Sequence, residues 1–95
     1  MNIRIICAAN HYNNGDKYEH QPKNIRFGLV LCGLRHHNII ANFCHLTGEE
    51  IGDNCIQGFL TSDDRFVDRE EAGVIAFAAN QTSTLIKRLH SEDLY

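Results

Sequence analysis

The stretch from Gln57 to Gln81 constrains the fold of this chain most, because it predicts a hairpin that leads directly into a helix. Residues 59–61 and 65–67 are short runs rich in aromatic and β-branched side chains, which favour strands. Between them, residues 62–64 are a serine and a pair of aspartates, whose side chains hydrogen-bond their own backbone in turns. We therefore predict a tight β-hairpin over residues 59–67.

The helix that follows has a clear start. Asp68 precedes Glu71 with the spacing of a capping box, in which each residue bonds a free amide at the start of the helix. No residue from Ala72 to Ala79 is charged, which predicts a helix that is covered on most sides. Gly73 in its interior costs about 1 kcal/mol relative to alanine. We therefore expect another backbone to pack closely against Gly73.

The rest of the chain predicts further strands and another helix. We expect a first strand over residues 2–9, and a turn at 13–16 that returns the chain into a short partner strand over 17–20. The run over residues 25–32 is apolar after Arg26 and predicts a buried central strand.

Apolar residues recur at helical spacing over residues 36–46, and Gly48 lies where a helix C-terminal glycine belongs. The polar residues of 49–56 predict a surface loop, and residues 84–89 are compatible with strand or helix. Two large apolar residues end the chain and predict a C-terminus packed against the domain. The predicted fold is a single α+β domain, a small antiparallel sheet with two packed helices, over residues 1–95.

Composition bounds the partners of the protein. The 95 residues are 43% hydrophobic and 22% charged, which is ordinary for one folded domain. The net charge of -3 argues against a protein that grips a long nucleic acid through its phosphates. It leaves room for a small phosphorylated ligand held by a few arginines, because such a site needs only local positive charge.

The cysteines and the apolar runs bear on localisation. The 4 cysteines are widely spaced, without a Cys-x-x-Cys pair, and the chain does not start like a signal peptide. We therefore expect free thiols in a reducing cytoplasm. The longest uncharged run near the middle, Phe27 to Leu34, is too short to cross a bilayer, so no membrane partner is expected.

A candidate anion site lies where the apolar run gives way to the predicted helix. Free amides at a helix start attract anions, and Arg35 would add a bidentate grip on phosphate. His36 and His37 would donate hydrogen bonds or stack on the ligand. The alternative is that Arg35 pairs with a carboxylate while the histidines cap the helix.

Arginines near the predicted hairpin extend this candidate site. Arg65 and Arg69 flank the junction of hairpin and helix, and Arg88 lies beyond it, so these guanidiniums could converge with Arg35. Phe59 and Phe66 would offer ring faces for a base. The alternative is that the arginines form surface ion pairs and the phenylalanines are core. The candidate ligand-binding residues are Arg35, His36, His37, Phe59, Phe66, Asp68, Arg69 and Arg88.

Metal and covalent chemistry have little support. Several cysteines and histidines have ligand atoms suited to zinc, but their spacing does not match a finger or a ribbon. A cysteine–histidine nucleophile pair can be assembled on paper, yet nothing selects one cysteine over the others. We therefore predict no metal site, no catalytic residues and no cofactor.

Five segments carry a resemblance to known proteins: His20–Ile25, Gly28–Asn38, Gln57–Ser62, Arg65–Ala72 and Ser91–Tyr95. In these segments the sequence resembles a family of small proteins encoded by phages and prophages. That family is similar to the first Thoeris anti-defence family, phage proteins that sequester cyclic ADP-ribose-type signals and so silence a TIR-domain immune system. The resemblance implies binding of a cyclic nucleotide signal, a cyclic ADP-ribose isomer or a cyclic oligonucleotide, without turnover.

The same resemblance implies roles for individual residues. Arg35 would contact a phosphate or ribose and Phe59 the adenine, while the Asp68-Arg69 turn and Arg88 would supply polar contacts. Asn80 stands where the family pattern has a glycine, and asparagine still permits a left-handed helix cap.

A chain of 95 residues is small for enclosing a dinucleotide, so we expect a site shared between protomers of a homodimer or a higher homo-oligomer. Other classes of function remain open. The protein would instead bind a host defence protein directly, or cleave a nucleotide with His36 or His37 as general base.

Overall fold

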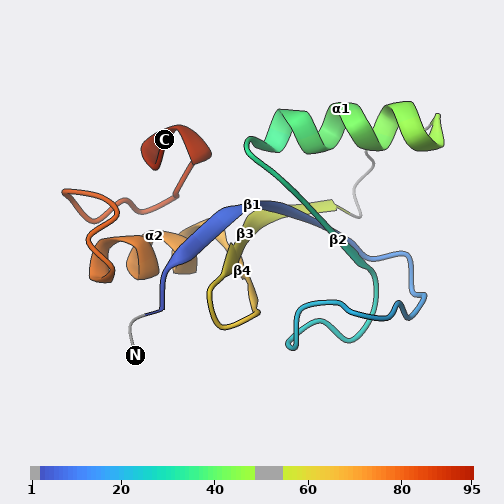
Figure 1. The fold of residues 1–95 in the computed structure, drawn as a ribbon, viewed down its shortest axis with the longest axis horizontal. Coiled ribbons are helices and arrows are strands. Elements are labelled where there is room, and N and C mark those ends of the chain that lie inside the picture. The colour runs from blue at the N-terminus through green and yellow to red at the C-terminus, as the bar shows by residue number, and fades with distance from the viewer. Residues whose placement is uncertain (1–2, 49–54) are drawn as a thin grey trace.

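The computed structural model describes residues 3–48 and 55–95 of the chain, and it has the predicted α+β architecture. A four-stranded antiparallel sheet in the order β2-β1-β3-β4 carries the helices α1 and α2 and a short C-terminal 3-10 turn, η1 (Figure 1). The elements are β1 Ile5–Tyr12, β2 Leu29–Gly33, α1 His36–Thr47, β3 Cys55–Thr61, β4 Phe66–Asp68, α2 Arg69–Ala78 and η1 Ser91–Asp93.

One face of the sheet holds the core. Ala8 of β1 pairs with Phe59 of β3, and Phe59 pairs with Val67 of β4, so these side chains share a face. Ile39 of α1 and Ala76 of α2 belong to the same buried cluster, so both helices cover this face. The C-terminal segment, red in Figure 1, returns between α2 and the start of α1.

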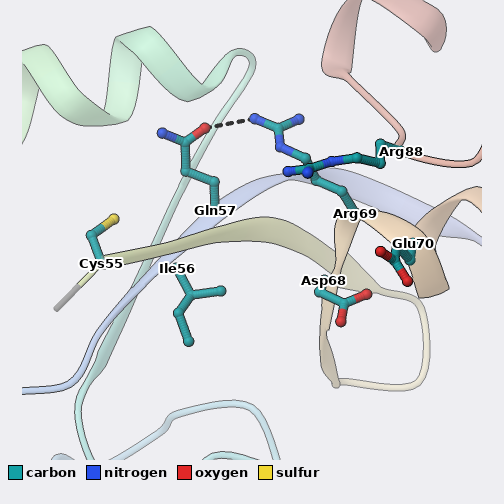
Figure 2. Close-up of a pocket in the computed structure, with 7 residues that line it drawn as sticks. All are labelled: Cys55, Ile56, Gln57, Asp68, Arg69, Glu70 and Arg88. Atoms are coloured by element: carbon teal, nitrogen blue, oxygen red, sulfur yellow. Dashed lines mark hydrogen bonds between the residues drawn. The ribbon is translucent and has the colours of Figure 1, made fainter. Parts of the chain in front are cut away.

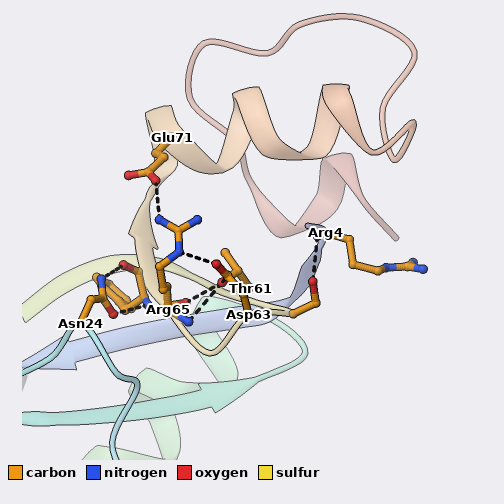
Figure 3. A network of polar contacts seen from close by, with 8 residues as sticks. Arg4, Asn24, Thr61, Asp63, Arg65 and Glu71 are labelled. Atoms are coloured by element: carbon orange, nitrogen blue, oxygen red, sulfur yellow. Dashed lines mark hydrogen bonds and ion pairs between the residues drawn. The ribbon is translucent and has the colours of Figure 1, made fainter. Parts of the chain in front are cut away.

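The predicted hairpin is confirmed, and a polar network fixes it to its surroundings (Figure 3). The Arg65 guanidinium lies 2.8 Å from the Asp63 carboxylate in the turn and 3.1 Å from Glu71 in the first turn of α2. The Thr61 hydroxyl also donates to Asp63, and this bond and Arg65 lower the pKa of that carboxyl. Arg65 is therefore engaged by ion pairs and does not reach a ligand site.

Of the two hydrogen bonds of the predicted capping box at the start of α2, only the first is confirmed. Asp68 Oδ1 accepts a hydrogen bond from the backbone N–H of Glu71 at 2.9 Å, as expected of an N-cap. The return bond of a capping box is not made, because the Glu71 carboxylate pairs with Arg65 instead.

Gly73 marks the predicted backbone contact. A Cβ atom at this position would lie 1.9 Å from the main-chain oxygen of Ile86, so the chain after α2 crosses the helix against Gly73. The prediction that the helix is covered on most sides is wrong on its outer face. Val74 is 58% exposed and Phe77 is 45% exposed, because the sheet and the crossing segment cover only the other sides.

The first strand and its predicted partner differ from the sequence prediction. β1 starts later and runs further, from Ile5 to Tyr12, and residues 17–20 form no strand. The side chains of Asn13 and Asn14 accept bonds from backbone amides two residues on, and His20 has a φ of 61°. These local turns lead the chain away from β1, which pairs with β2 and β3 instead.

The predicted central strand is an edge strand. β2 covers only Leu29–Gly33, and it pairs with β1 alone among the described strands. The Gln21 side chain accepts from Val30 N at 2.8 Å, and Cys32 is exposed. A continuous apolar run does not distinguish a strand buried on both faces from one that packs on a single face, so the position in the sheet was not predictable.

The remaining predictions concern loops and ends. Helix α1 is confirmed, and Gly48 closes it with a φ of 72° and an N–H bond to Cys44 O. Of the predicted loop 49–56, residues 49–54 lie outside the described residues, and the last two positions begin β3. Asn80 has the predicted left-handed conformation, with a φ of 61°. The C-terminus is packed down, since the Tyr95 hydroxyl donates to Leu34 O.

Candidate functional site

A cleft of about 550 Å³ lies beside the junction of β4 and α2 (Figure 2). Because β4 pairs only with Gly58–Leu60, the first residues of β3 extend past it and line the cleft. Residues 85–88, which cross α2 at Gly73 and form the crossing segment, add the side chain of Arg88. The residues that line the cleft are Cys55, Ile56, Gln57, Asp68, Arg69, Glu70 and Arg88.

Arg69 is held in this cleft by the fold. Its Nη1 donates to the main-chain oxygen of Leu89 at 2.8 Å, and its Nη2 donates to Gln57 Oε1 at 2.6 Å (Figure 2). A guanidinium has five N–H donors, so the remaining donors are available to a ligand. Burial, followed by the positive charge of Arg88, lowers the pKa of Arg69, and an anion in the cleft would oppose this shift by stabilising the charged guanidinium.

Arg88 lies next to Arg69 in the close-up and has a different local setting (Figure 2). It is exposed, and it makes no ion pair or side-chain hydrogen bond with a described residue. The cleft therefore combines one guanidinium that is fixed by hydrogen bonds with one that is free to close on an anion.

Carboxylates also line the cleft. Asp68 Oδ1 is used as the cap of α2, and Glu70 has no ion pair with a described residue. Carboxylate oxygens accept hydrogen bonds from hydroxyl groups, and guanidiniums bind phosphate. The site is suited to a ligand that carries both phosphate and hydroxyl groups.

Arg35 lies outside this cleft and holds the C-terminal segment. Its guanidinium donates to the main-chain oxygen of Tyr95 and lies 5.0 Å from the centre of the Tyr95 ring. It is also 3.7 Å from the Glu92 carboxylate. Arg35 therefore adopts the alternative given in the sequence analysis, in which it pairs with a carboxylate.

The histidines that follow differ from each other. His36 is 7% exposed, donates from Nε2 to Gly58 O at 2.7 Å, and packs edge-to-face on Phe59. Burial lowers the pKa of His36, so it is held as the neutral imidazole. His37 is exposed and does not line the cleft.

Phe59 and Phe66 are placed away from the cleft. Phe59 has no exposed surface, and Phe66 is 8% exposed and packs against the ring of His11. They point to opposite faces of the sheet, because Phe59 pairs with Val67 while Phe66 pairs with the next residue, Leu60. In this conformation neither ring offers a face to a ligand in the cleft.

The structure thus brings Asp68, Arg69 and Arg88 together and leaves the other predicted residues apart. Gln57 and Glu70 line the cleft and were not predicted. Gln57 was within reach of sequence analysis, because alternation along a strand places it on the same face as Phe59. Glu70 directly follows Arg69 at the start of α2, so its adjacency to Asp68 and Arg69 was the signal that could have found it.

Two findings bear on other kinds of site. In the ranges 3–48 and 55–95, no group of three or more histidine, cysteine or acidic residues is arranged to hold a metal ion. None of the helices in those ranges is long and apolar enough to span a bilayer.

Comparison with known proteins identifies the family. The model of the family described as Phage T4 y16D protein matches residues 4–95. The chain belongs to this family. No curated protein matches it, and no solved structure matches it. Membership in the Phage T4 y16D family makes this a phage-type protein, in agreement with the resemblance to small phage proteins.

The buried His36 predicts a pH dependence of stability. Its pKa is lowered in the folded state, whereas the unfolded chain has a pKa of about 6.5. Below that pH the unfolded state binds the proton first, so the free energy of unfolding should fall as the pH falls through and below this range. Urea unfolding at a series of pH values measures this free energy. His36→Gln, which can still donate to Gly58 O, should flatten the acidic part of the profile of stability against pH. An unchanged profile in His36→Gln would assign the acid sensitivity to other groups.

Proposed function

We propose that this protein binds a small phosphorylated nucleotide in the cleft at Arg69 and Arg88 and sequesters it without cleaving it. The observation that carries the proposal is this guanidinium pair, one member fixed by Gln57 and Leu89 O and the other free of described partners. Guanidiniums bind phosphate oxygens in bidentate fashion, and the adjacent Glu70 carboxylate suits a ribose hydroxyl. A volume of about 550 Å³ is within the range of small-molecule sites.

The proposed ligand class rests on the sequence resemblance, and membership in a phage family is compatible with it. We propose a cyclic nucleotide immune signal of the cyclic ADP-ribose type or a cyclic oligonucleotide, bound in the host cytoplasm as an anti-defence measure. A cleft on a domain of this size leaves part of such a ligand uncovered, which favours a homodimer or a higher homo-oligomer.

Binding without turnover is supported by the groups that line the cleft. Burial raises the pKa of the Cys55 thiol, and a protonated thiol is a poor nucleophile. His36, considered above as a general base, is buried and bonded to Gly58 O. Cleavage would need a base or nucleophile close to the guanidinium pair, and the Glu70 carboxylate is the group in the cleft that would have to serve as the base.

The first experiment mixes the purified protein with a cyclic ADP-ribose isomer and follows the free nucleotide by chromatography before and after heat denaturation. Depletion followed by recovery of the intact nucleotide is the expected result. Recovery of an altered nucleotide would make the protein an enzyme. If neither this ligand nor a cyclic oligonucleotide is depleted, direct binding of a host defence protein becomes the better hypothesis, and isolation of a stable protein complex without a small molecule would test it.

Arg88→Gln tests the site itself. Loss of one charged hydrogen-bond donor costs about 2 kcal/mol of binding, so the dissociation constant should rise about thirtyfold. Stability should change by less than about 0.5 kcal/mol, because Arg88 is exposed and bonds no described residue. Calorimetry measures the dissociation constant of the ligand, and thermal unfolding measures the stability.

Arg35→Gln is the matched control, since it removes the same charge outside the cleft. Its binding should stay near that of the unmodified protein. If Arg35→Gln abolishes binding and Arg88→Gln does not, the ligand site lies at the start of α1, as the sequence pattern suggested.

A further inference from the structure

A second groove, of about 370 Å³, lies on the outer side of α2. Glu70 and Val74 of α2 form one bank, and Leu85, Ile86 and Lys87 of the crossing segment form the other. Val74 is 58% exposed and Leu85 is 60% exposed, so the groove presents apolar side chains to solvent. Exposed apolar side chains gathered in one groove make it a candidate site of association.

The exposure is unusual for the composition of the helix. Residues 72–79 carry no charge, and such helices are normally covered on most sides. Here Ala72 and Ala76 pack into the core, and Gly73 admits the main chain of Ile86. Phe77, one turn beyond Val74, is 45% exposed. The described part of the chain thus covers the inner side of α2 and leaves the outer side partly exposed.

Opposite charges stand on the two banks of the groove. Glu70 lies on the α2 bank and Lys87 on the opposite bank, and neither forms an ion pair with a described residue. A two-fold axis along the groove would place each bank against the opposite bank of a second copy. Glu70 would then meet the partner's Lys87, and Val74 would meet the partner's Leu85, each contact occurring twice.

We propose that this groove is the interface of an isologous homodimer in which the α2 bank of each copy packs on the crossing-segment bank of the other. The charge pairs fix the register, and the apolar side chains supply the buried surface. The proposal does not depend on the identity of the ligand. Because Glu70 lines both the groove and the cleft, the dimer places the two ligand clefts next to the interface.

The test is the oligomeric state of the full chain, measured by sedimentation velocity over a wide concentration range. The unmodified protein should dimerise, and Val74→Asp should be monomeric. Glu70→Lys and Lys87→Glu should each raise the dimer dissociation constant about tenfold, because each places like charges face to face. The double variant Glu70→Lys/Lys87→Glu should return the dimer dissociation constant to that of the unmodified protein.

Leu46→Asp is the control, since Leu46 is 84% exposed on α1, away from the groove. It should leave the dimer intact, and circular dichroism of every variant checks that the fold is kept. A chain that is monomeric at every concentration would overturn the proposal. A dimer that survives Val74→Asp would also overturn it. If the double charge reversal fails to restore association, the two-fold pairing of Glu70 with Lys87 is overturned.

Discussion

Replacing Gly73 with alanine should destabilise the protein by about 3 kcal/mol, although alanine is the better helix former. The new Cβ would lie 1.9 Å from the main-chain oxygen of Ile86, far inside contact distance. A backbone carbonyl cannot rotate away as a flexible side chain can, so the crossing segment must move. That movement strains the hydrogen bond from Leu89 N to Arg69 O. Its free-energy cost outweighs the gain of about 1 kcal/mol in helix propensity.

Thermal unfolding measures this effect, and a loss of about 3 kcal/mol corresponds to a fall of roughly 15 °C in the melting temperature. Gly48→Ala is the comparison, because Gly48 has a φ of 72° and open space around its Cβ position. It should cost only the backbone term of about 1 kcal/mol. A loss in Gly73→Ala no larger than that in Gly48→Ala would show that the segment at Ile86 moves aside at little cost, and would contradict the prediction.

The features that sequence analysis predicted correctly are those that local chemistry determines. The turn at residues 62–64, the cap at Asp68 and the left-handed Asn80 depend on side chains bonding nearby backbone or on permitted φ values. Gly73 was informative because a glycine inside a helix has a cost that only a close contact explains.

The features that it missed depend on contacts between distant segments. The run over residues 25–32 predicts a central strand, yet the strand that forms there, β2, lies at an edge of the sheet, because its neighbours are set by turns elsewhere in the chain. Whether Val74 is covered depends on the path of the crossing segment, which lies beside it in the outer groove. Alternation in β3 and β4, once the register is known, decides that Phe59 and Phe66 point to opposite faces.

The candidate site shows the same division. Asp68 and Arg69 line one cleft because they are adjacent in sequence, and Arg88 joins them through the return of the C-terminal segment. Arg35 was grouped with them on residue type alone. The structure instead places it against Tyr95, which is distant in sequence and was assigned no contact.

Arg69→Met should have the largest effect on binding, with a rise of about a hundredfold in the ligand dissociation constant. The substitution removes the fixed member of the guanidinium pair and keeps an apolar stem of similar length. It also leaves Leu89 O and Gln57 Oε1 without their donor, so stability should fall by about 2 kcal/mol. Calorimetry with the cyclic ADP-ribose isomer and urea unfolding measure the two quantities.

Gln57→Glu separates the two roles of Arg69. A glutamate at this position can still accept the hydrogen bond from Arg69 Nη2, so the fold should keep its stability. The added negative charge would neutralise the guanidinium and repel a phosphate, so affinity should still fall at least about tenfold. If Arg69→Met loses stability while both variants bind the nucleotide normally, Arg69 serves only to tie the C-terminal segment to the sheet. Loss of binding in Gln57→Glu at full stability would instead identify the charge of Arg69 as the feature that the ligand recognises.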